Sequence, residues 1–470
     1  MNYLEWFYKL SEIPHGSGNT KEISDFLIDF ALEKGLQSYQ DDYNNVIIYK
    51  AAQNGGEDSK PVILQGHIDM VCEKEEGYDI DFTKDGLRLV EKDGFLKSEG
   101  TTLGGDDGIA VAYMLAILED ETIRHPDLEC VFTVDEEIGM LGAAALDKTR
   151  LMGRRLLNID SEEEGTLLVS CAGGATVELT VPFIRRGAQG ETYKLSVTGL
   201  TGGHSGVEID KGRANADVLL GYILKELLLA DDSLRLISAE GGLKDNAIPV
   251  KASALIKSKN RELIEEALKG LTNKLKEEYA STDPGMDIIF EEASSDDYPL
   301  DEMQNLSILM MMGELPFGVR AYSKDIEGLV QTSLNLGIMT TEKECIKLIY
   351  SVRSCVEAEK QALIEELSFL ARSVGGTVNV KGEYPAWEYK KDSELRDKMT
   401  SLYEEMFEKT MKVEAIHAGV ECGIFAGALE GLDAVSFGPD ILEIHTPREK
   451  LDLKSAERTY SYILTLLEEL

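Results

Sequence analysis

Short apolar runs that stop at acid-rich turns recur along the chain. The runs cover residues 45–49, 62–64, 128–134, 155–159 and 434–437. Their length and their content of β-branched residues are typical of buried strands. Stretches with helical spacing of apolar residues lie between them, at 21–34 and 109–120. Strands that alternate with helices predict an α/β sheet.

Polar side chains follow these runs at the points where the strands should end. His67 and Asp69 follow the run at 62–64, and the next two runs are followed by Glu136, Glu137 and Asp160. Ligands of α/β proteins bind beyond the carboxyl ends of the strands. The sequence therefore predicts a single site at which these side chains meet.

The residue types near that edge are ligands of divalent metal ions. The candidate ligands are His67, Asp106, Glu137, Asp160 and His445. Two dications that share one carboxylate can acidify a water molecule and polarise a carbonyl group. Two histidines favour zinc, with cobalt or manganese as substitutes, and an all-oxygen magnesium site stays open. Asp106 and its neighbour Asp107 could instead be simple caps of the helix over 109–120.

Two further acidic residues are candidates for roles beside these ligands. Asp69 lies two residues after His67, on the same face of an extended segment, so it can take the spare ring proton of a metal-bound imidazole. Glu136 precedes Glu137, and neighbours at a strand end tend to point apart. One of them can bind metal while Glu136 serves as general base. The simpler alternative for His67 and Asp69 is an ordinary surface turn.

Length, charge and cysteine usage narrow the class of protein. A chain of 470 residues is long for one hydrophobic core and favours two domains. Its 48 Lys and Arg against 86 Asp and Glu give a net charge of −38, which argues against nucleic acid or an anionic membrane as partner. No apolar run reaches the roughly 18 residues of a membrane span, and the N-terminus lacks the pattern of a signal peptide. Six cysteines without a C-x-x-C pair or disulfide-type spacing fit a reducing cytoplasm.

The middle of the chain differs from both ends. From about residue 182 to 384 its strand and helix patterns are longer, and the strand–helix order at 248–279 recurs at 344–370. We expect an inserted α+β domain, with two related halves as one possibility. The expected domains are 1–185 and 385–470 for the first unit and 186–384 for the insert. The return of the chain after the insert would bring His445 back to the site.

The chain resembles a known family in seven motifs: GHIDMV, GTTLGGDDGIA, DEEIGMLGA, LNIDSEEEG, GGHSGVEI, DNAIP and HAGVECG. As a set they are similar to the aminoacyl-histidine dipeptidases. These form the bacterial peptidase D (Xaa-His dipeptidase), carnosinase-like branch of the di-zinc exopeptidases, which also include aminoacylases. The resemblance runs from IPHGSGNTKEI to HTPREK, essentially the whole chain. NIDSEEEG and HAGVECG point to this branch rather than to the wider family.

The resemblance implies a catalytic zinc domain with a mixed sheet, interrupted by a smaller lid or dimerisation domain. It implies that His67, Asp106 and Asp160 hold one of two zinc ions. Asp106 would bridge to the second ion, which Glu137 and His445 complete. The residue after Asp106 is Asp in this chain, where some relatives carry Asn.

Five residues outside the ligand set are assigned from the resemblance. His204 would reach a neighbouring active site and donate to the carbonyl oxygen, and a turn histidine is the alternative. Asn246 is a similar donor or a turn residue. Arg353 could bind the substrate carboxylate through its planar fork, or it could face solvent. His417 and Glu421 would line the substrate pocket.

The resemblance implies metal-dependent hydrolysis of dipeptides, with Xaa-His preferred, by a metal-activated water and Glu136 as base. The expected partners are a small peptide substrate and a second copy of the chain, joined through the lid. A related di-zinc tripeptidase or N-acyl amino-acid deacylase is the alternative enzyme. A catalytically silent metal-bound binding protein is the alternative outside enzymes, and the intact ligand set and Glu136 count against it. The other two histidines, His15 and His125, are expected to be structural.

Overall fold

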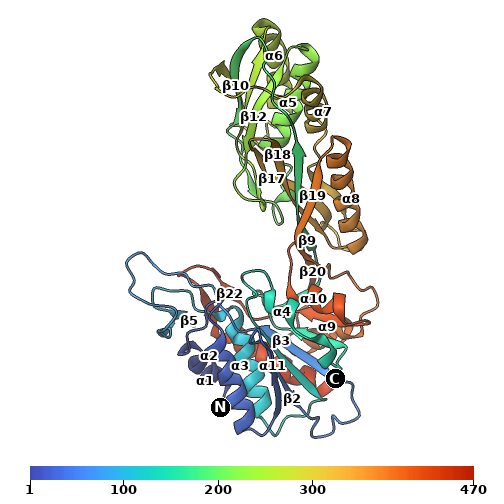
Figure 1. Cartoon of the computed structure of the whole chain (residues 1–470). Coiled ribbons are helices and arrows are strands. Elements are labelled where there is room, and N and C mark those ends of the chain that lie inside the picture. Colours follow the sequence, from blue (N-terminus) through green and yellow to red (C-terminus); the bar gives the residue numbers. More distant parts are fainter. The chain divides into compact units, whose positions relative to one another are not determined.

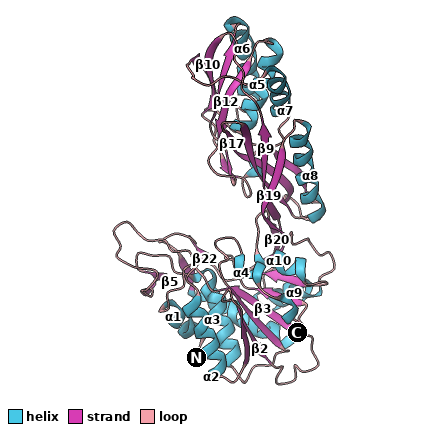
Figure 2. Cartoon of the chain, in the orientation of Figure 1, coloured by secondary structure: helices cyan, strands magenta, loops and turns pink.

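The computed structural model describes residues 1–470, and the chain divides into two compact units. Unit 1 comprises Met1–Cys171, Tyr389–Ala415 and Val420–Leu470, and unit 2 comprises Ala172–Glu388 and Ile416–Gly419. Both ends of the chain belong to unit 1 (Figure 1). Each unit has its own large sheet and its own helices (Figure 2).

Unit 1 contains a mixed eight-stranded sheet in the order β1-β2-β6-β3-β7-β21-β8-β20. Its strands are β1 (Gln37–Gln40), β2 (Val46–Lys50), β3 (Val62–His67), β6 (Leu128–Thr133), β7 (Arg155–Asn158), β8 (Thr166–Cys171), β20 (Lys412–Ile416) and β21 (Asp433–Ser436). β6, β3, β7 and β21 are parallel neighbours, whereas β2 and β8 pair antiparallel with β6 and β21. Every residue of β3 and β6 is buried, as is usual for parallel strands covered on both faces. The predicted mixed α/β sheet is confirmed.

The helices of unit 1 account for that burial. They are α1 (Tyr3–Ser11), α2 (Lys21–Glu33), α3 (Gly105–Glu119), α4 (Leu141–Ala145), α9 (Glu394–Phe407), α10 (Glu421–Ala428) and α11 (Leu453–Glu469). α3 packs on β3 and is itself covered by α1 (Figure 1). All of its residues from Ile109 to Leu118 are buried, which explains why the helix is apolar all round. The predicted end of α2 is confirmed, because Gly35 follows it with φ +68°.

A small four-stranded sheet lies beside the main one in unit 1, in the order β22-β23-β5-β4. Its strands are β4 (Leu89–Lys92), β5 (Phe95–Ser98), β22 (Ile441–Leu442) and β23 (Lys450–Asp452). It pairs the segment before α3 with the segment before α11 through β5 and β23. The loop between β22 and β23 contains His445, so this pairing brings His445 close to the segment that leads into α3.

Unit 2 contains a second sheet in the order β15-β10-β14-β12-β17-β18-β9-β19, with β16 beside β17 and the short pair β11 and β13 apart from it. Its strands are β9 (Gly173–Pro182), β10 (Glu191–Thr198), β11 (Gly203–His204), β12 (Arg235–Gly241), β13 (Ala247–Ile248), β14 (Ala252–Ser258), β15 (Asp287–Glu292), β16 (Gly318–Tyr322), β17 (Val330–Thr341), β18 (Cys345–Ser354) and β19 (Thr377–Tyr384). Its helices are α5 (Ala216–Ala230), α6 (Arg261–Glu278), α7 (Glu302–Met312) and α8 (Glu357–Ser373). The core of the unit lies between this sheet and the helices.

The two halves of the unit 2 sheet have the same internal order. Read from one edge the order is β15-β10-β14-β12, and read from the other edge it is β19-β9-β18-β17. In both halves a strand, a helix and an edge strand follow one another in the chain, as β14-α6-β15 and β18-α8-β19. This topology agrees with the two related halves suggested by the recurring strand–helix pattern.

The unit boundaries differ from the expected ones by one strand. β9 precedes the expected boundary at residue 185, yet it pairs with β18 and β19 of unit 2. On the other side, residues 385–388 stay with unit 2 and residues 416–419 return to it. The sheet that a strand joins depends on hydrogen bonds to distant segments, which the local pattern of apolar residues does not specify.

No helix of the structure combines the length and the apolar composition that a membrane crossing requires.

The close approach of β3 to α3 gives a stability prediction. A methyl group added at Gly66 would lie 2.4 Å from Asp107 Oδ2 and 2.8 Å from Ala110 Cβ. Gly66→Ala should therefore lower the free energy of unfolding by about 1–3 kcal/mol. Gly270 in α6 is the matched control, because a methyl group there meets no atom within 4 Å. Gly270→Ala should raise the free energy of unfolding by about 0.5–1 kcal/mol. Urea unfolding of both variants measures this, and an unchanged Gly66→Ala protein would contradict the tight packing.

Candidate functional site

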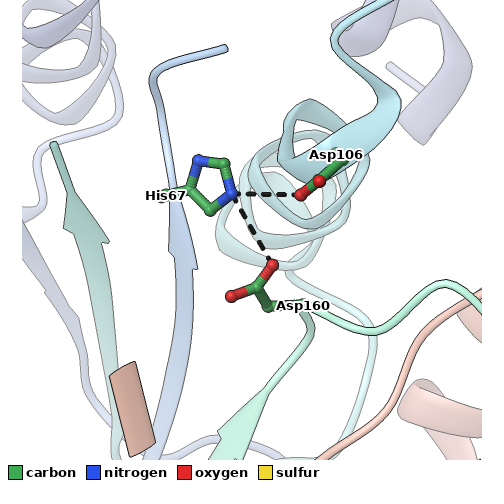
Figure 3. A group of neighbouring side chains, drawn as sticks. All are labelled: His67, Asp106 and Asp160. Atoms are coloured by element: carbon green, nitrogen blue, oxygen red, sulfur yellow. Dashed lines mark hydrogen bonds and ion pairs between the residues drawn. The ribbon is translucent and has the colours of Figure 1, made fainter. Parts of the chain in front are cut away.

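Two parallel strands and one helix of unit 1 bring three side chains to one point. His67 is the last residue of β3, Asp160 follows β7, and Asp106 lies at the start of α3. His67 Nε2 lies 3.1 Å from Asp106 Oδ1 and 3.6 Å from Asp160 Oδ1 (Figure 3). These three residues form a group whose ligand atoms all lie within 4.8 Å of one another. They are the residues that the sequence assigned to one metal ion.

A second group shares Asp106 with the first. His445 Nε2 lies 3.2 Å from Asp106 Oδ2 and 2.8 Å from Glu137 Oε1. The two oxygens of Asp106 are therefore directed at two different histidines, His67 and His445. A carboxylate in this position can bridge two cations, as the sequence analysis expected of Asp106.

The ring orientation of His67 indicates what these two groups can bind. Its Nδ1 donates a hydrogen bond to the backbone carbonyl of Asp69 at 3.0 Å. The lone pair of Nε2 then faces the carboxylates of Asp106 and Asp160, which are also acceptors. Acceptors that face one another need a proton or a cation between them. A divalent ion satisfies both sides, so the donor set fits a metal centre.

The electrostatics of the buried acids support the same conclusion. Burial raises the pKa of Glu136 to about 9 and that of Glu162 to about 7, and the charge of Asp160 contributes to both shifts. Hydrogen bonds to Asp106 and Glu137 raise the pKa of His445 to about 10. Burial thus disfavours ionisation of Glu136 and Glu162, and bound cations would offset this cost.

Asp69 links the first histidine to the candidate base. Its carboxylate accepts hydrogen bonds from Ser17 Oγ at 2.8 Å and from the backbone N–H of Glu136 at 3.1 Å. Burial raises the pKa of Asp69, but the hydrogen bond from His67 and the other donors outweigh it and lower the pKa overall. Asp69 therefore stays ionised and connects His67 to the segment after β6. No spacing in the sequence pointed to Ser17.

A buried carboxylate holds the loop that carries Asp106. Glu449 accepts hydrogen bonds from the backbone N–H groups of Leu103, Gly104 and Gly105 at 2.7, 3.2 and 2.8 Å. Burial raises the pKa of Glu449 to about 7. The N-cap position of α3 is Gly104, and Asp106 follows it in a non-helical conformation. Both carboxylate oxygens of Asp106 contact histidines, which argues against a simple aspartate cap. Sequence reasoning missed Glu449, because its partners are backbone groups far away in the chain.

The side chain of Asp107, the residue after Asp106, points toward the backbone of β3 and not toward the two histidines. Asp107 Oδ2 accepts a hydrogen bond from the backbone N–H of His67 at 3.2 Å, and its side chain lies under Gly66. Burial and the charge of Asp160 raise the pKa of Asp107 well above its usual value. Asp107 belongs to none of the groups that could hold a metal ion.

In unit 2, the surroundings of His204 fix its ring. His204 Nδ1 accepts hydrogen bonds from the backbone N–H groups of Gly206 at 3.1 Å and Val207 at 3.3 Å. In a neutral ring the proton is then on Nε2, which is free to donate. Burial and the positive charge of Arg353 lower the pKa of His204, so the ring stays neutral near pH 7. This is the form that an oxyanion donor requires.

Arg353 has an unused donor in unit 2. Its Nη1 donates to Tyr384 Oη at 3.3 Å, while its buried Nε has no hydrogen-bond partner. His417 lies in the same unit, where its Nε2 is 2.7 Å from Ser333 Oγ and its Nδ1 is buried without a partner. Burial and the charge of Arg353 lower the pKa of His417 to about 3. An anionic group would satisfy the open donor of Arg353.

The other two expected site residues, Asn246 and Glu421, differ in their exposure to solvent. Asn246 is exposed, and its backbone carbonyl accepts a hydrogen bond from Ser205 at 2.9 Å. Glu421 belongs to unit 1 and is fully buried, with Oε2 at 2.5 Å from Gln65 Nε2 and 2.6 Å from Thr133 Oγ1. Glu421 therefore lies beneath the strand ends and does not line an open pocket.

The remaining two histidines, His125 and His15, differ in how close they lie to the candidate metal ligands. His125 is buried and donates from Nδ1 to the carbonyl of Pro126 at 2.7 Å, as expected of a structural residue. His15 donates from Nδ1 to the carbonyl of Ile13, and the charges of Asp69 and His67 act on its pKa, which burial lowers overall. His15 thus lies close to the metal centre, although its position in the sequence gave no sign of this.

Two groups of histidines and carboxylates share Asp106, and a third candidate group joins His67 to Glu136 and Glu137. Such a cluster is typical of the site of a metallohydrolase. Residues 63–469 match the model described as peptidase family M20/M25/M40, and the chain belongs to this family. It is therefore a peptidase, and the resemblance found in the motifs is confirmed.

Relatives of known description cover the whole chain. The cytosol non-specific dipeptidase of Escherichia coli (strain K12) is 35% identical over an alignment of 470 positions, which covers 99% of this chain and 96% of that protein. The crystal structure of aminoacylhistidine dipeptidase from Vibrio alginolyticus has a TM-score of 0.94 at 34% identity, covering 100% of this chain and 96% of that one. Aminopeptidase PepT from Bacillus cereus, with a TM-score of 0.58 at 17% identity over 100% of this chain and 98% of that one, shares the fold alone.

The geometry separates Asp106 from Asp107 in a metal-binding experiment. Asp106→Asn removes the charge between the two groups, so the protein should lose at least one of two bound ions on dialysis. Asp107→Asn keeps the acceptor for the N–H of His67 and should retain the wild-type metal content. Metal analysis of both variants after zinc loading decides this. Loss of metal from Asp107→Asn alone would reverse the two assignments.

Proposed function

We propose that this protein is a cytoplasmic dipeptidase that uses two zinc ions and prefers peptides with carboxy-terminal histidine. The observation that supports it most is the position of Asp106, whose two oxygens face His67 and His445. The relatives described as a cytosol non-specific dipeptidase and an aminoacylhistidine dipeptidase support the substrate class and the location. The six free cysteines agree with a reducing compartment.

His67 and Asp160 would hold one ion, Glu137 and His445 the other, and Asp106 both. Bound there as a pair, divalent cations supply a more acidic water molecule and polarise the peptide carbonyl. Imidazole and carboxylate ligands favour zinc, with cobalt or manganese as possible substitutes. Asp69 would keep the Nδ1 proton of His67 in place, so that Nε2 presents its lone pair.

Glu136 is the general base in this proposal. Its backbone is tied to Asp69, and Glu137, the next residue, contacts His445. Nearby cations favour the ionised form of an acid, so metal binding should lower the pKa of Glu136 from about 9. Glu136 then takes a proton from the attacking water and returns it to the leaving amine nitrogen.

Unit 2 would supply recognition of the substrate. Arg353 binds the terminal carboxylate through its open Nε, with His417 and Asn246 beside the substrate. His204 donates its Nε2 proton to the carbonyl oxygen as negative charge develops there. We further propose a homodimer through unit 2, in which His204 serves the site of the neighbouring subunit. Supporting this, the His204 loop carries no metal ligand of its own.

Removal of the metal should abolish activity. Dialysis against a chelator should reduce hydrolysis of an Xaa-His dipeptide to the background rate, and added zinc should restore it, because the ions activate the water. Activity and metal content are followed in the same samples. Full activity in protein without a bound transition metal would contradict the proposal.

Recognition of the free carboxylate should depend on Arg353. Loss of a charge-assisted hydrogen bond costs about 1.5–3 kcal/mol, so Arg353→Ala should lower kcat/KM about 10- to 100-fold. Arg372→Ala, at an exposed position of α8, is the matched control and should behave as wild type. The carboxamide of the same dipeptide should be a poor substrate for the wild type. Equal rates for acid and amide would refute carboxylate binding, and preference for N-acetyl amino acids or tripeptides would favour the alternative enzymes.

The Glu136→Gln and Glu137→Gln variants should lose activity for different reasons. Glu136→Gln should keep both ions and bind substrate, while kcat falls by about 10²–10⁴ because no base accepts the proton. Glu137→Gln should lose affinity for one ion, and excess zinc should recover part of its activity. Metal content and kcat of both variants measure the difference. If Glu136→Gln is the variant that loses zinc, the two roles must be exchanged.

A further inference from the structure

The motif HAGVECG contributes a buried glutamate that the proposed reaction does not use. We propose that Glu421 is a positioning residue that holds in register the strand ends from which the metal ligands extend. This inference rests on the proposed metal centre and adds a residue beneath it. Glu421 is the first residue of α10, and its side chain is fully buried in unit 1.

Glu421 joins two of the parallel strands through one oxygen. Its Oε2 accepts a hydrogen bond from Gln65 Nε2 at 2.5 Å and another from Thr133 Oγ1 at 2.6 Å. Gln65 belongs to β3, two residues before His67, and Thr133 is the last residue of β6, shortly before Glu136. The carboxylate therefore connects the strand that carries a histidine ligand to the strand that carries the acids.

The same chain of hydrogen bonds reaches the third strand. Gln65 Oε1 accepts a hydrogen bond from Asn158 Nδ2 at 2.7 Å, and Asn158 is the last residue of β7, two residues before Asp160. Gln65 and His67 lie on the same face of β3, because they are two residues apart in a strand. The polar chain thus lies on the ligand face of β3, one step below His67.

The direction of these hydrogen bonds depends on Glu421. Gln65 and Thr133 both act as donors toward Oε2, which fixes the amide of Gln65 so that its oxygen receives Asn158. The hydrogen bonds from Gln65 and Thr133 place both strands at fixed distances from one atom. Without that acceptor, the two donors would keep only longer contacts, from Gln65 Nε2 to Thr133 Oγ1 at 3.1 Å and from Thr133 Oγ1 to the carbonyl of Gly66 at 3.4 Å. Loss of the two shorter hydrogen bonds favours a shift of the strands.

Three variants test the role by metal binding and kinetics. Glu421→Ala removes the acceptor, Glu421→Gln keeps one acceptor oxygen, and Thr133→Val removes one donor of the pair. Glu430→Ala, an exposed position after α10, is the control. Folding is checked by circular dichroism and thermal unfolding. The readouts are cobalt affinity, the visible absorption spectrum of the cobalt-loaded protein, and kcat and KM for an Xaa-His dipeptide.

We expect Glu421→Ala to lower cobalt affinity about 10- to 100-fold, the usual effect of losing a residue behind the ligands. Its cobalt spectrum should change and its kcat should fall, with KM close to wild type. Thr133→Val should weaken cobalt binding less than Glu421→Ala, and Glu421→Gln should recover most of the affinity. Glu430→Ala should match the wild type.

Several results would overturn the inference. One is a folded Glu421→Ala protein with wild-type cobalt affinity and spectrum. Another is a raised KM with unchanged kcat, which would make Glu421 a substrate-lining residue. A Glu421→Gln protein as impaired as Glu421→Ala would show that charge, not hydrogen bonding, matters. If Glu421→Ala does not fold, Thr133→Val and Glu421→Gln decide the question. Cobalt affinity and spectra are measured without substrate, so failure of the wild type to cleave dipeptides would test the proposed function alone.

Discussion

The arrangement of the site in unit 1 is constrained by the acidic side chains that converge at the carboxyl ends of the parallel strands. Asp106, Asp160 and Glu137 converge there with two histidines, within a few ångströms of one another. Burial raises the pKa of Asp160, whereas hydrogen bonds from His445 and His67 outweigh burial and lower the pKa of Asp106. Positive charge between the acids therefore stabilises their ionised forms. The strand ends, the start of α3 and the loop before β23 all meet at this point, and each supplies a ligand.

The supporting residues explain how such a site stays in place. Asp69 fixes the ring of His67 and the backbone of Glu136, and Glu449 satisfies the backbone of the loop before Asp106. Each is a buried acid that accepts hydrogen bonds from backbone groups, and these bonds offset part of the cost of burying its charge. In unit 2, burial and the positive charge of Arg353 lower the pKa values of His204 and His417, so both rings stay neutral near pH 7. The Nε of Arg353 has no hydrogen-bond partner.

Much of the fold and of the site in unit 1 could be predicted from the local pattern of apolar and polar residues. The strands of the parallel core and the ligands His67 and Asp160 were predictable, because each ligand directly follows an apolar run. His445 needed the resemblance and the expected return of the chain, since no strong pattern surrounds it. Glu449 and His15 could not be found in this way. Their roles depend on backbone groups and neighbours that only the folded chain brings near, as does the membership of β9 in unit 2.

Anomalous X-ray diffraction from crystals of zinc-loaded protein would measure whether Asp106 bridges two cations. We expect two anomalous peaks in unit 1, one in contact with His67 and Asp160, the other with Glu137 and His445, and an Asp106 oxygen in contact with each. A single peak, or a pair of peaks that Asp106 does not touch, would contradict this expectation.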